Sequence, residues 1–165
     1  MIKKFNLLFV TLFGIGKIKF APGTFGSLFA IIILFDLFHL LKISPNIILF
    51  CLTIIFLYSL IAINNYIKNN DNKDPSEIVV DEFIGQSIPI FLYEISHGSV
   101  KETGDAIIFY IIIFILFRFF DIVKPFPINF FDKKFKNSFG IIMDDVCAGL
   151  YVVAIIILYM VFIWK

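Results

Sequence analysis

The chain has 165 residues, of which 60% are hydrophobic and only 16% carry a charge. Ordinary soluble domains are roughly 45–50% apolar and about 25% charged, so a water-soluble fold of this length could not cover so much apolar surface. The 14 basic and 13 acidic residues leave a net charge of +1, which argues against a nucleic-acid partner. The composition therefore predicts a single membrane-embedded domain over residues 1–165.

The first apolar run, residues 5–13, follows two lysines and is too short to cross a bilayer. It resembles the first two regions of a signal peptide, but no cleavage site with small residues follows it. We therefore expect a short, uncleaved N-terminal helix that lies at the membrane interface.

A helix that crosses a bilayer needs about 20 apolar residues. Three runs approach this length, and they cover residues 25–41, 45–63 and 146–164. Asp36 and His39 interrupt the first run, and because they lie one helical turn apart we expect them to pair. A fourth run, residues 106–117, can span only if Arg118 and Asp121 lie near the membrane boundary.

A shorter apolar segment, residues 78–93, lies in the most polar part of the chain. As a helix it would extend about 24 Å, which is less than the roughly 30 Å of the hydrocarbon core. If this segment crosses or deeply re-enters the membrane, most basic residues share one face, which the positive-inside rule makes cytoplasmic. We predict an all-α integral membrane helical bundle of four to five segments, whose basic end faces the cytoplasm.

Polar residues are concentrated in four motifs on this predicted cytoplasmic face. The first, APGTFGS, covers residues 21–27 and precedes the first membrane run. Thr24 or Ser27 can cap the helix, and the free amides of a helix N-terminus suit a phosphate group. A helix cap with no further role is the simpler alternative.

Two of the motifs contain adjacent carboxylates. The second, DPSEIVVDEFIG (74–85), carries Asp81 and Glu82, and the fourth, GIIMDDVCAG (140–149), carries Asp144 and Asp145. Carboxylates embedded among apolar residues repel one another unless a cation lies between them, and hard oxygen ligands suit Mg²⁺. A solvated loop edge is the alternative for the first pair, and a helix cap would account for one member of the second.

The third motif, FRFFDIVKPFP (117–127), contains the only arginine of the chain. On a helix, Asp121 lies on the same face as Arg118 and can pair with it, and Lys124 adds a second cation. A guanidinium group can bind phosphate oxygens in a bidentate manner. Snorkelling of Arg118 and Lys124 to lipid headgroups is the alternative, but it does not account for Asp121.

In this order, the four motifs resemble those of the phosphatidylglycerophosphatase A family, and the resemblance extends over residues 14–151. It implies a magnesium-dependent lipid phosphatase of the bacterial inner (cytoplasmic) membrane that converts phosphatidylglycerophosphate to phosphatidylglycerol. The chain departs from the family at Lys19, where relatives have proline, and at residues 137–139, where they are richer in glycine. Both differences lie outside the carboxylate motifs.

The residues and the resemblance together predict a functional site. The predicted Mg²⁺ ligands are Asp81, Glu82, Asp144 and Asp145. The predicted substrate-binding residues are Thr24, Ser27, Arg118 and Lys124. The predicted catalytic residues are Asp81, Asp121, Arg118, Lys124 and Asp145, with either water or an aspartate as the nucleophile. The alternatives are a small membrane ion or metal carrier and a lipid phosphotransferase that uses the same metal and phosphate site.

Overall fold

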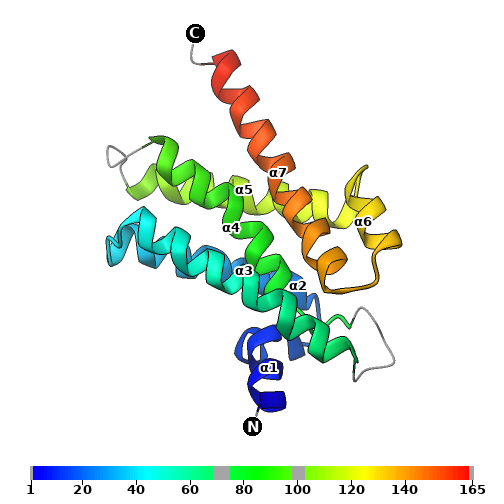
Figure 1. The fold of residues 1–165 in the computed structure, drawn as a ribbon. Coiled ribbons are helices and arrows are strands. Elements are labelled where there is room, and N and C mark those ends of the chain that lie inside the picture. Colours follow the sequence, from blue (N-terminus) through cyan, green and yellow to red (C-terminus); the bar gives the residue numbers. More distant parts are fainter. Residues whose placement is uncertain (1, 69–74, 98–102, 164–165) are drawn as a thin grey trace.

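The structure, a computed structural model, describes residues 2–68, 75–97 and 103–163, and every regular element in these ranges is helical (Figure 1). Two short elements are a 3-10 helix, η1, and a π-helix, η2. In chain order the elements are α1 (Ile2–Val10), η1 (Leu12–Lys17), α2 (Pro22–Phe35), η2 (Asp36–Leu40), α3 (Pro45–Lys68), α4 (Val80–His97), α5 (Thr103–Val123), α6 (Ile128–Lys134) and α7 (Ser138–Ile163). The prediction of an all-α membrane bundle is confirmed.

Four of the described helical stretches are long and apolar enough to cross a membrane, and each overlaps one of the four apolar runs found in the sequence. They are Pro22–Leu40, Pro45–Lys68, Gly104–Val123 and Ser138–Phe162. The third of these continues past the apolar run, so Arg118 and Asp121 lie in its last two turns. This placement at the end of the helix is the one that the sequence required for a fourth span.

Helix α4 lies at the centre of the bundle and packs against α2, α3, α5 and α7. It has 18 residues, so it is about 27 Å long, and it begins at Val80 rather than at residue 78. It is not among the four candidate spans. Its Asp81, Glu82 and Glu94 make it more polar than those spans, and the neighbouring helices surround it.

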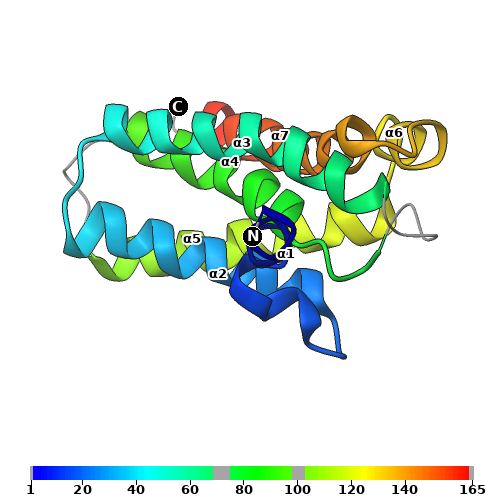
Figure 2. The ribbon, with the colours of Figure 1, turned by 60° about the horizontal axis from the view of Figure 1, so that its bottom comes forward.

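The motif-bearing helix ends meet at one end of the bundle. Figure 2 shows that α2, α4 and α7 begin at this end and that α3 and α5 finish there. Successive helices must alternate in direction for this to happen, and α4 supplies the reversal between α3 and α5. The bundle therefore has the helix directions that the five-segment arrangement requires.

The N-terminal segment packs on α3 and on the loop before α4. The Tyr58 hydroxyl donates a 2.7 Å hydrogen bond to Asn6, and the amide of Val79 donates a 2.9 Å bond to the carbonyl of Val10. The α-helix ends at Val10, earlier than the expected 5–13 segment, because Leu12 and Phe13 have positive φ angles. The N-terminal segment thus holds the chain that leads into α4.

The prediction that Asp36 and His39 pair with each other is wrong. The His39 Nε2 atom lies 3.3 Å from Glu94 Oε1 on α4. Residues 36–40 form a π-helix in which the Leu41 amide bonds to the Asp36 carbonyl. In this wider turn, residues three apart no longer lie above one another as they do in an α-helix, so His39 instead faces α4.

Candidate functional site

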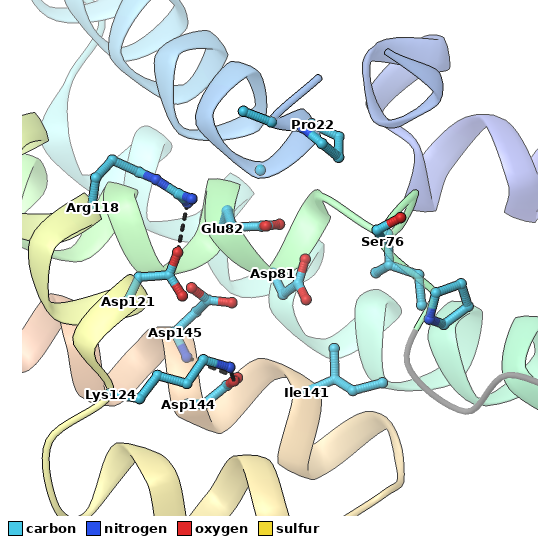
Figure 3. Close-up of a pocket in the computed structure, with 14 residues that line it drawn as sticks. Pro22, Ser76, Asp81, Glu82, Arg118, Asp121, Lys124, Ile141, Asp144 and Asp145 are labelled. Atoms are coloured by element: carbon cyan, nitrogen blue, oxygen red, sulfur yellow. Dashed lines mark hydrogen bonds and ion pairs between the residues drawn. The ribbon is translucent and has the colours of Figure 1, made fainter. Parts of the chain in front are cut away.

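A polar pocket of about 230 Å³ lies where the four motifs meet. Helices α2, α4, α5 and α7 and the loop before α4 all contribute to its wall (Figure 3). The charged residues that line it are Asp81, Glu82, Arg118, Asp121, Lys124, Asp144 and Asp145. These include every charged residue that the sequence analysis predicted for the site, although they lie up to 64 positions apart in the chain.

Three carboxylates form the centre of the pocket. Asp81 and Glu82 occupy the first turn of α4, Asp145 comes from α7, and one oxygen of each lies within 4.8 Å of the others. In the described part of the chain, Asp81 Oδ1, Glu82 Oε2 and Asp145 Oδ1 are buried without a hydrogen-bond partner. Buried carboxylates are costly unless a cation compensates them. The donor set therefore fits a hard divalent cation.

Two glycines bring α4 and α7 close enough to assemble this carboxylate group. A Cβ atom on Gly149 would lie 2.4 Å from the carbonyl oxygen of Gly85. A Cβ atom on Gly85 would lie 2.6 Å from the carbonyl oxygen of Asp145. Since real Cβ atoms do not approach this closely, the backbones of the two helices can touch only because both residues lack a side chain.

Arg118 lies beside the carboxylates and is paired as predicted. Its Nη1 atom lies 2.6 Å from Asp121 Oδ2, one helical turn later on α5. The same nitrogen donates a 3.4 Å hydrogen bond to the Ser27 hydroxyl. Gly23 makes room for this arrangement, because a Cβ atom there would lie 2.0 Å from Glu82 Oε1 and 3.3 Å from Arg118 Nη1.

Lys124 follows α5 directly and is held by two carboxylates. Its Nζ donates hydrogen bonds to Asp132 Oδ1 at 2.7 Å and to Asp144 Oδ2 at 2.9 Å. Burial would lower the pKa of Lys124, but the hydrogen bonds and the charges of the two aspartates outweigh it and raise the pKa above its ordinary value. Lys124 is therefore positively charged at neutral pH at the edge of the pocket.

Asp144 occupies a different position from the other predicted metal ligands. Besides accepting from Lys124, it accepts a 3.0 Å hydrogen bond from the amide of Asp145 through Oδ1. The four expected metal ligands thus divide into three that converge and one that pairs with a cation. Asp132 was missed by sequence reasoning, because an acid beside Lys133 and Lys134 looks like part of a solvated surface.

The first motif supplies backbone rather than the expected side chains. Helix α2 begins at Pro22, and its N-cap residue, Ala21, makes no side-chain cap. The prediction that Thr24 or Ser27 caps the helix is wrong, because the Ser27 hydroxyl donates to the Gly23 carbonyl at 2.9 Å.

Neither hydroxyl residue of this motif is among those that line the pocket. Thr24 is half-buried, and Ser27 reaches the site only through its contact with Arg118. The lining residues that were not predicted are Ala21, Pro22, Gly23, Pro75, Ser76, Ile78 and Ile141. All of these lie within or beside the four motifs, so their position in the sequence was the available signal.

Comparison with known proteins gives a consistent result. A family model described as Phosphatidylglycerophosphatase A matches residues 8–160. A Haemophilus influenzae protein named Phosphatidylglycerophosphatase A is 39% identical over 152 residues, which are 92% of this chain and 85% of the relative. A Bacteroides thetaiotaomicron protein named "Putative phosphatidylinositol-3-phosphatase" is 37% identical over 146 residues, 88% of this chain and 87% of the relative.

An Escherichia coli protein, also named Phosphatidylglycerophosphatase A, is 32% identical over 147 residues, which are 83% of this chain and 73% of the relative. No solved structure matches the chain. The matched residues of the family model include all four motifs and therefore the whole polar pocket.

Proposed function

Because the chain belongs to the phosphatidylglycerophosphatase A family, we propose that it hydrolyses phosphatidylglycerophosphate to phosphatidylglycerol and inorganic phosphate in a Mg²⁺-dependent reaction. Family membership makes it a phosphoric monoester hydrolase, and its four long apolar helices together with its bacterial relatives support a multi-pass bacterial membrane protein. The names of the Haemophilus influenzae and Escherichia coli relatives support this substrate. Membership of an enzyme family argues against the ion or metal carrier.

The observation that carries the proposal is a group of three converging carboxylates beside two cations. Asp81, Glu82 and Asp145 have unpartnered buried oxygens in the described structure, and they would hold Mg²⁺. When bound, this ion would neutralise charge on the phosphate and polarise its P–O bonds. Arg118 and Lys124 supply two fixed positive charges next to it.

The residues of the chain would bind and orient the phosphate. Arg118 would bind two phosphate oxygens through its planar fork, and the 2.6 Å contact with Asp121 would fix the direction of that fork. Lys124 would contact a further oxygen while Asp132 and Asp144 limit its movement. Phosphoryl transfer depends mainly on such positioning and charge stabilisation. In hydrolysis, the water oxygen bonds to phosphorus, the ester P–O bond breaks, and a proton ends on the released glycerol oxygen.

Phosphate release from the purified protein tests the proposal. The protein in detergent is given phosphatidylglycerophosphate with Mg²⁺ or with a chelator, and we expect release only with Mg²⁺. Asp81→Asn and Asp145→Asn should abolish release, whereas Asp105→Asn, an exposed acid outside the pocket, should not. Metal-independent release, or full activity of the two pocket variants, would contradict the proposal.

The same assay separates hydrolysis from phosphotransfer. With excess free glycerol present, a phosphatase should still release one inorganic phosphate for each lipid consumed. A lipid phosphotransferase would instead produce glycerol phosphate at the expense of inorganic phosphate. Mass spectrometry of the soluble products distinguishes the two reactions.

The name of the Bacteroides thetaiotaomicron relative favours a second candidate substrate, a phosphatidylinositol 3-phosphate. Both lipids carry a phosphate monoester on a diacylglycerol-based headgroup, so the same pocket chemistry applies to either. We expect kcat/KM for phosphatidylglycerophosphate to exceed that for the inositol lipid. The reverse order, measured with both lipids in one detergent, would assign the chain to the inositol lipid.

The pocket is proposed to face the cytoplasm of a bacterial inner membrane. Basic residues at the pocket end of the bundle include Lys17, Lys19, Lys133 and Lys134, which the positive-inside rule assigns to the cytoplasm. A reporter that works only outside the cytoplasm should be active when fused after Ser44 and inactive after Phe135. The opposite pattern would reverse the orientation.

A further inference from the structure

Two apolar grooves follow α4 away from the polar pocket. The first, of about 540 Å³, lies between α3 and α4, with Thr53 and Phe56 on one wall. The second, of about 350 Å³, lies between α4 and α7, with Val153 and Met160 on its α7 wall. Two exposed residues of α4, Leu92 and Ile95, line both grooves. The grooves therefore lie on the two sides of a single ridge of α4.

The first groove and the polar pocket are lined by neighbouring residues of α4 and α7. Val146, which lines the groove, directly follows Asp145 of the pocket, and Ile84 of the groove comes two residues after Glu82. Ile141 lines the pocket and belongs to the same apolar cluster as Ile84 and Val146. The residues between the pocket and the groove thus include an apolar cluster, which suits a molecule with a charged end in the pocket and an apolar part in the groove.

The length of the grooves suits one leaflet of a membrane. From Ile84 to Ile95, α4 rises about 16 Å, which is close to half of the roughly 30 Å hydrocarbon core. Both volumes lie within the roughly 300–1,000 Å³ range of small-molecule sites. In Figure 1, α3 and α7 diverge from the pocket end, with α4 between them.

We propose that these two grooves bind the two acyl chains of the lipid substrate, which enters the pocket sideways from the membrane between α3 and α7. This inference rests on the proposed lipid phosphatase function and adds a site for the part of the substrate that does not react. One charged end and two apolar grooves on either side of the Leu92 and Ile95 ridge match a phosphate monoester of a diacyl lipid.

The grooves act mainly by orienting the lipid. Acyl chains that leave the bilayer are already in an apolar environment, so transfer into a groove removes little apolar surface from water. What the grooves restrict is the position of the headgroup relative to Arg118 and the carboxylates, and such positioning governs the rate of reaction. Blocking a groove should therefore slow turnover of long-chain substrates and spare short-chain ones.

A substitution in the first groove and a matched neighbour test this inference. Thr53 is exposed and lines the groove, whereas Ile54, 49% exposed, does not line it. We expect Thr53→Trp to lower kcat/KM for dioleoyl phosphatidylglycerophosphate about ten-fold and to leave the dihexanoyl substrate within about two-fold. Ile54→Trp should change neither value.

The kinetic outcomes separate the groove from the reaction itself. Equal dioleoyl activity of the Thr53→Trp and Ile54→Trp variants would overturn the groove proposal, as would an equal loss of Thr53→Trp activity on both substrates. If the wild-type protein releases no phosphate from either lipid, this result contradicts the proposed function and not the groove. The labelling experiment below then tests the groove.

Labelling requires no variant and no turnover. Phosphatidylglycerol with a photoreactive group at the end of each acyl chain is bound to the wild-type protein, and the labelled peptides are mapped by mass spectrometry. We expect labels that unlabelled lipid displaces on residues 49–56 and 84–95. Labels of equal yield on the exposed face of α5, at Ile108 and Ile111, would overturn the inference. So would unlabelled grooves in a stable dimer, which would indicate a second copy of the chain in them.

Discussion

Gly85→Ala should damage the site far more than it damages the fold. The added Cβ atom would lie 2.6 Å from the Asp145 carbonyl oxygen and 2.8 Å from the Asp145 Cβ atom. Ordinary contacts between non-bonded atoms begin at about 3.5 Å. The Asp145 carbonyl oxygen lies at 2.6 Å, so α7 must move away by about 0.9 Å. This shift moves Asp145 relative to Asp81 and Glu82, each of which has a carboxylate oxygen within 4.8 Å of one of its own.

The expected loss of activity is large because misplacement of a catalytic group by about 1 Å can cost about 100-fold in rate. The expected loss of stability is smaller. Overpacking costs about 1–3 kcal/mol, and alanine returns about 0.5–1 kcal/mol of helix propensity relative to glycine.

Phosphate release and thermal unfolding in detergent measure these two quantities separately. Gly104→Ala is the matched control, because a Cβ atom at this α5 position meets nothing within 4 Å. The control should keep full activity and unfold at the same or a slightly higher temperature. If Gly85→Ala retains more than about a third of the wild-type kcat/KM, the argument from misplacement is refuted.

Three further predictions concern the charged residues. Arg118→Lys should lower kcat/KM about 100-fold because an ammonium group cannot bind two phosphate oxygens in a fork; a loss of less than about three-fold would contradict the assigned role. The raised pKa of Lys124 means that its pairing with Asp132 stabilises the fold fully below the unfolded pKa of about 10.4 and is lost as pH rises through the higher folded value. The unfolding temperatures of the wild type and Lys124→Met should therefore differ by a constant amount between about pH 8 and 9, and a gap that narrows between these two pH values would contradict the pairing. Glu94→Gln weakens the contact with His39 and should lower the unfolding temperature by about 2–4 °C. The kcat/KM of this variant should stay within about two-fold of the wild-type value. A large loss of activity would instead place Glu94 and His39 in the catalytic machinery.

The sequence alone determined the long helices and the residues that form the site. A bilayer requires every backbone polar group to be satisfied within the segment, so each long apolar run had to be a helix. If residues 78–93 count as a crossing, the direction of each segment brings the motifs of Asp81, Arg118 and Asp145 together; the sequence left four and five segments open, and the direction of α4 decided between them. The pair of Arg118 and Asp121 was also predictable, because it depends only on helical spacing.

Only the tertiary structure decided how the charged groups are divided. Asp145 joins Asp81 and Glu82 while its neighbour Asp144 binds Lys124, and this difference depends on how α7 is rotated against α4. The contact of Asp132 with Lys124 depends on where α6 packs, and the local sequence around Asp132 does not predict that packing. Hydropathy determines which segments are helices, whereas the rotation and contact of those helices depend on close packing between residues far apart in the chain.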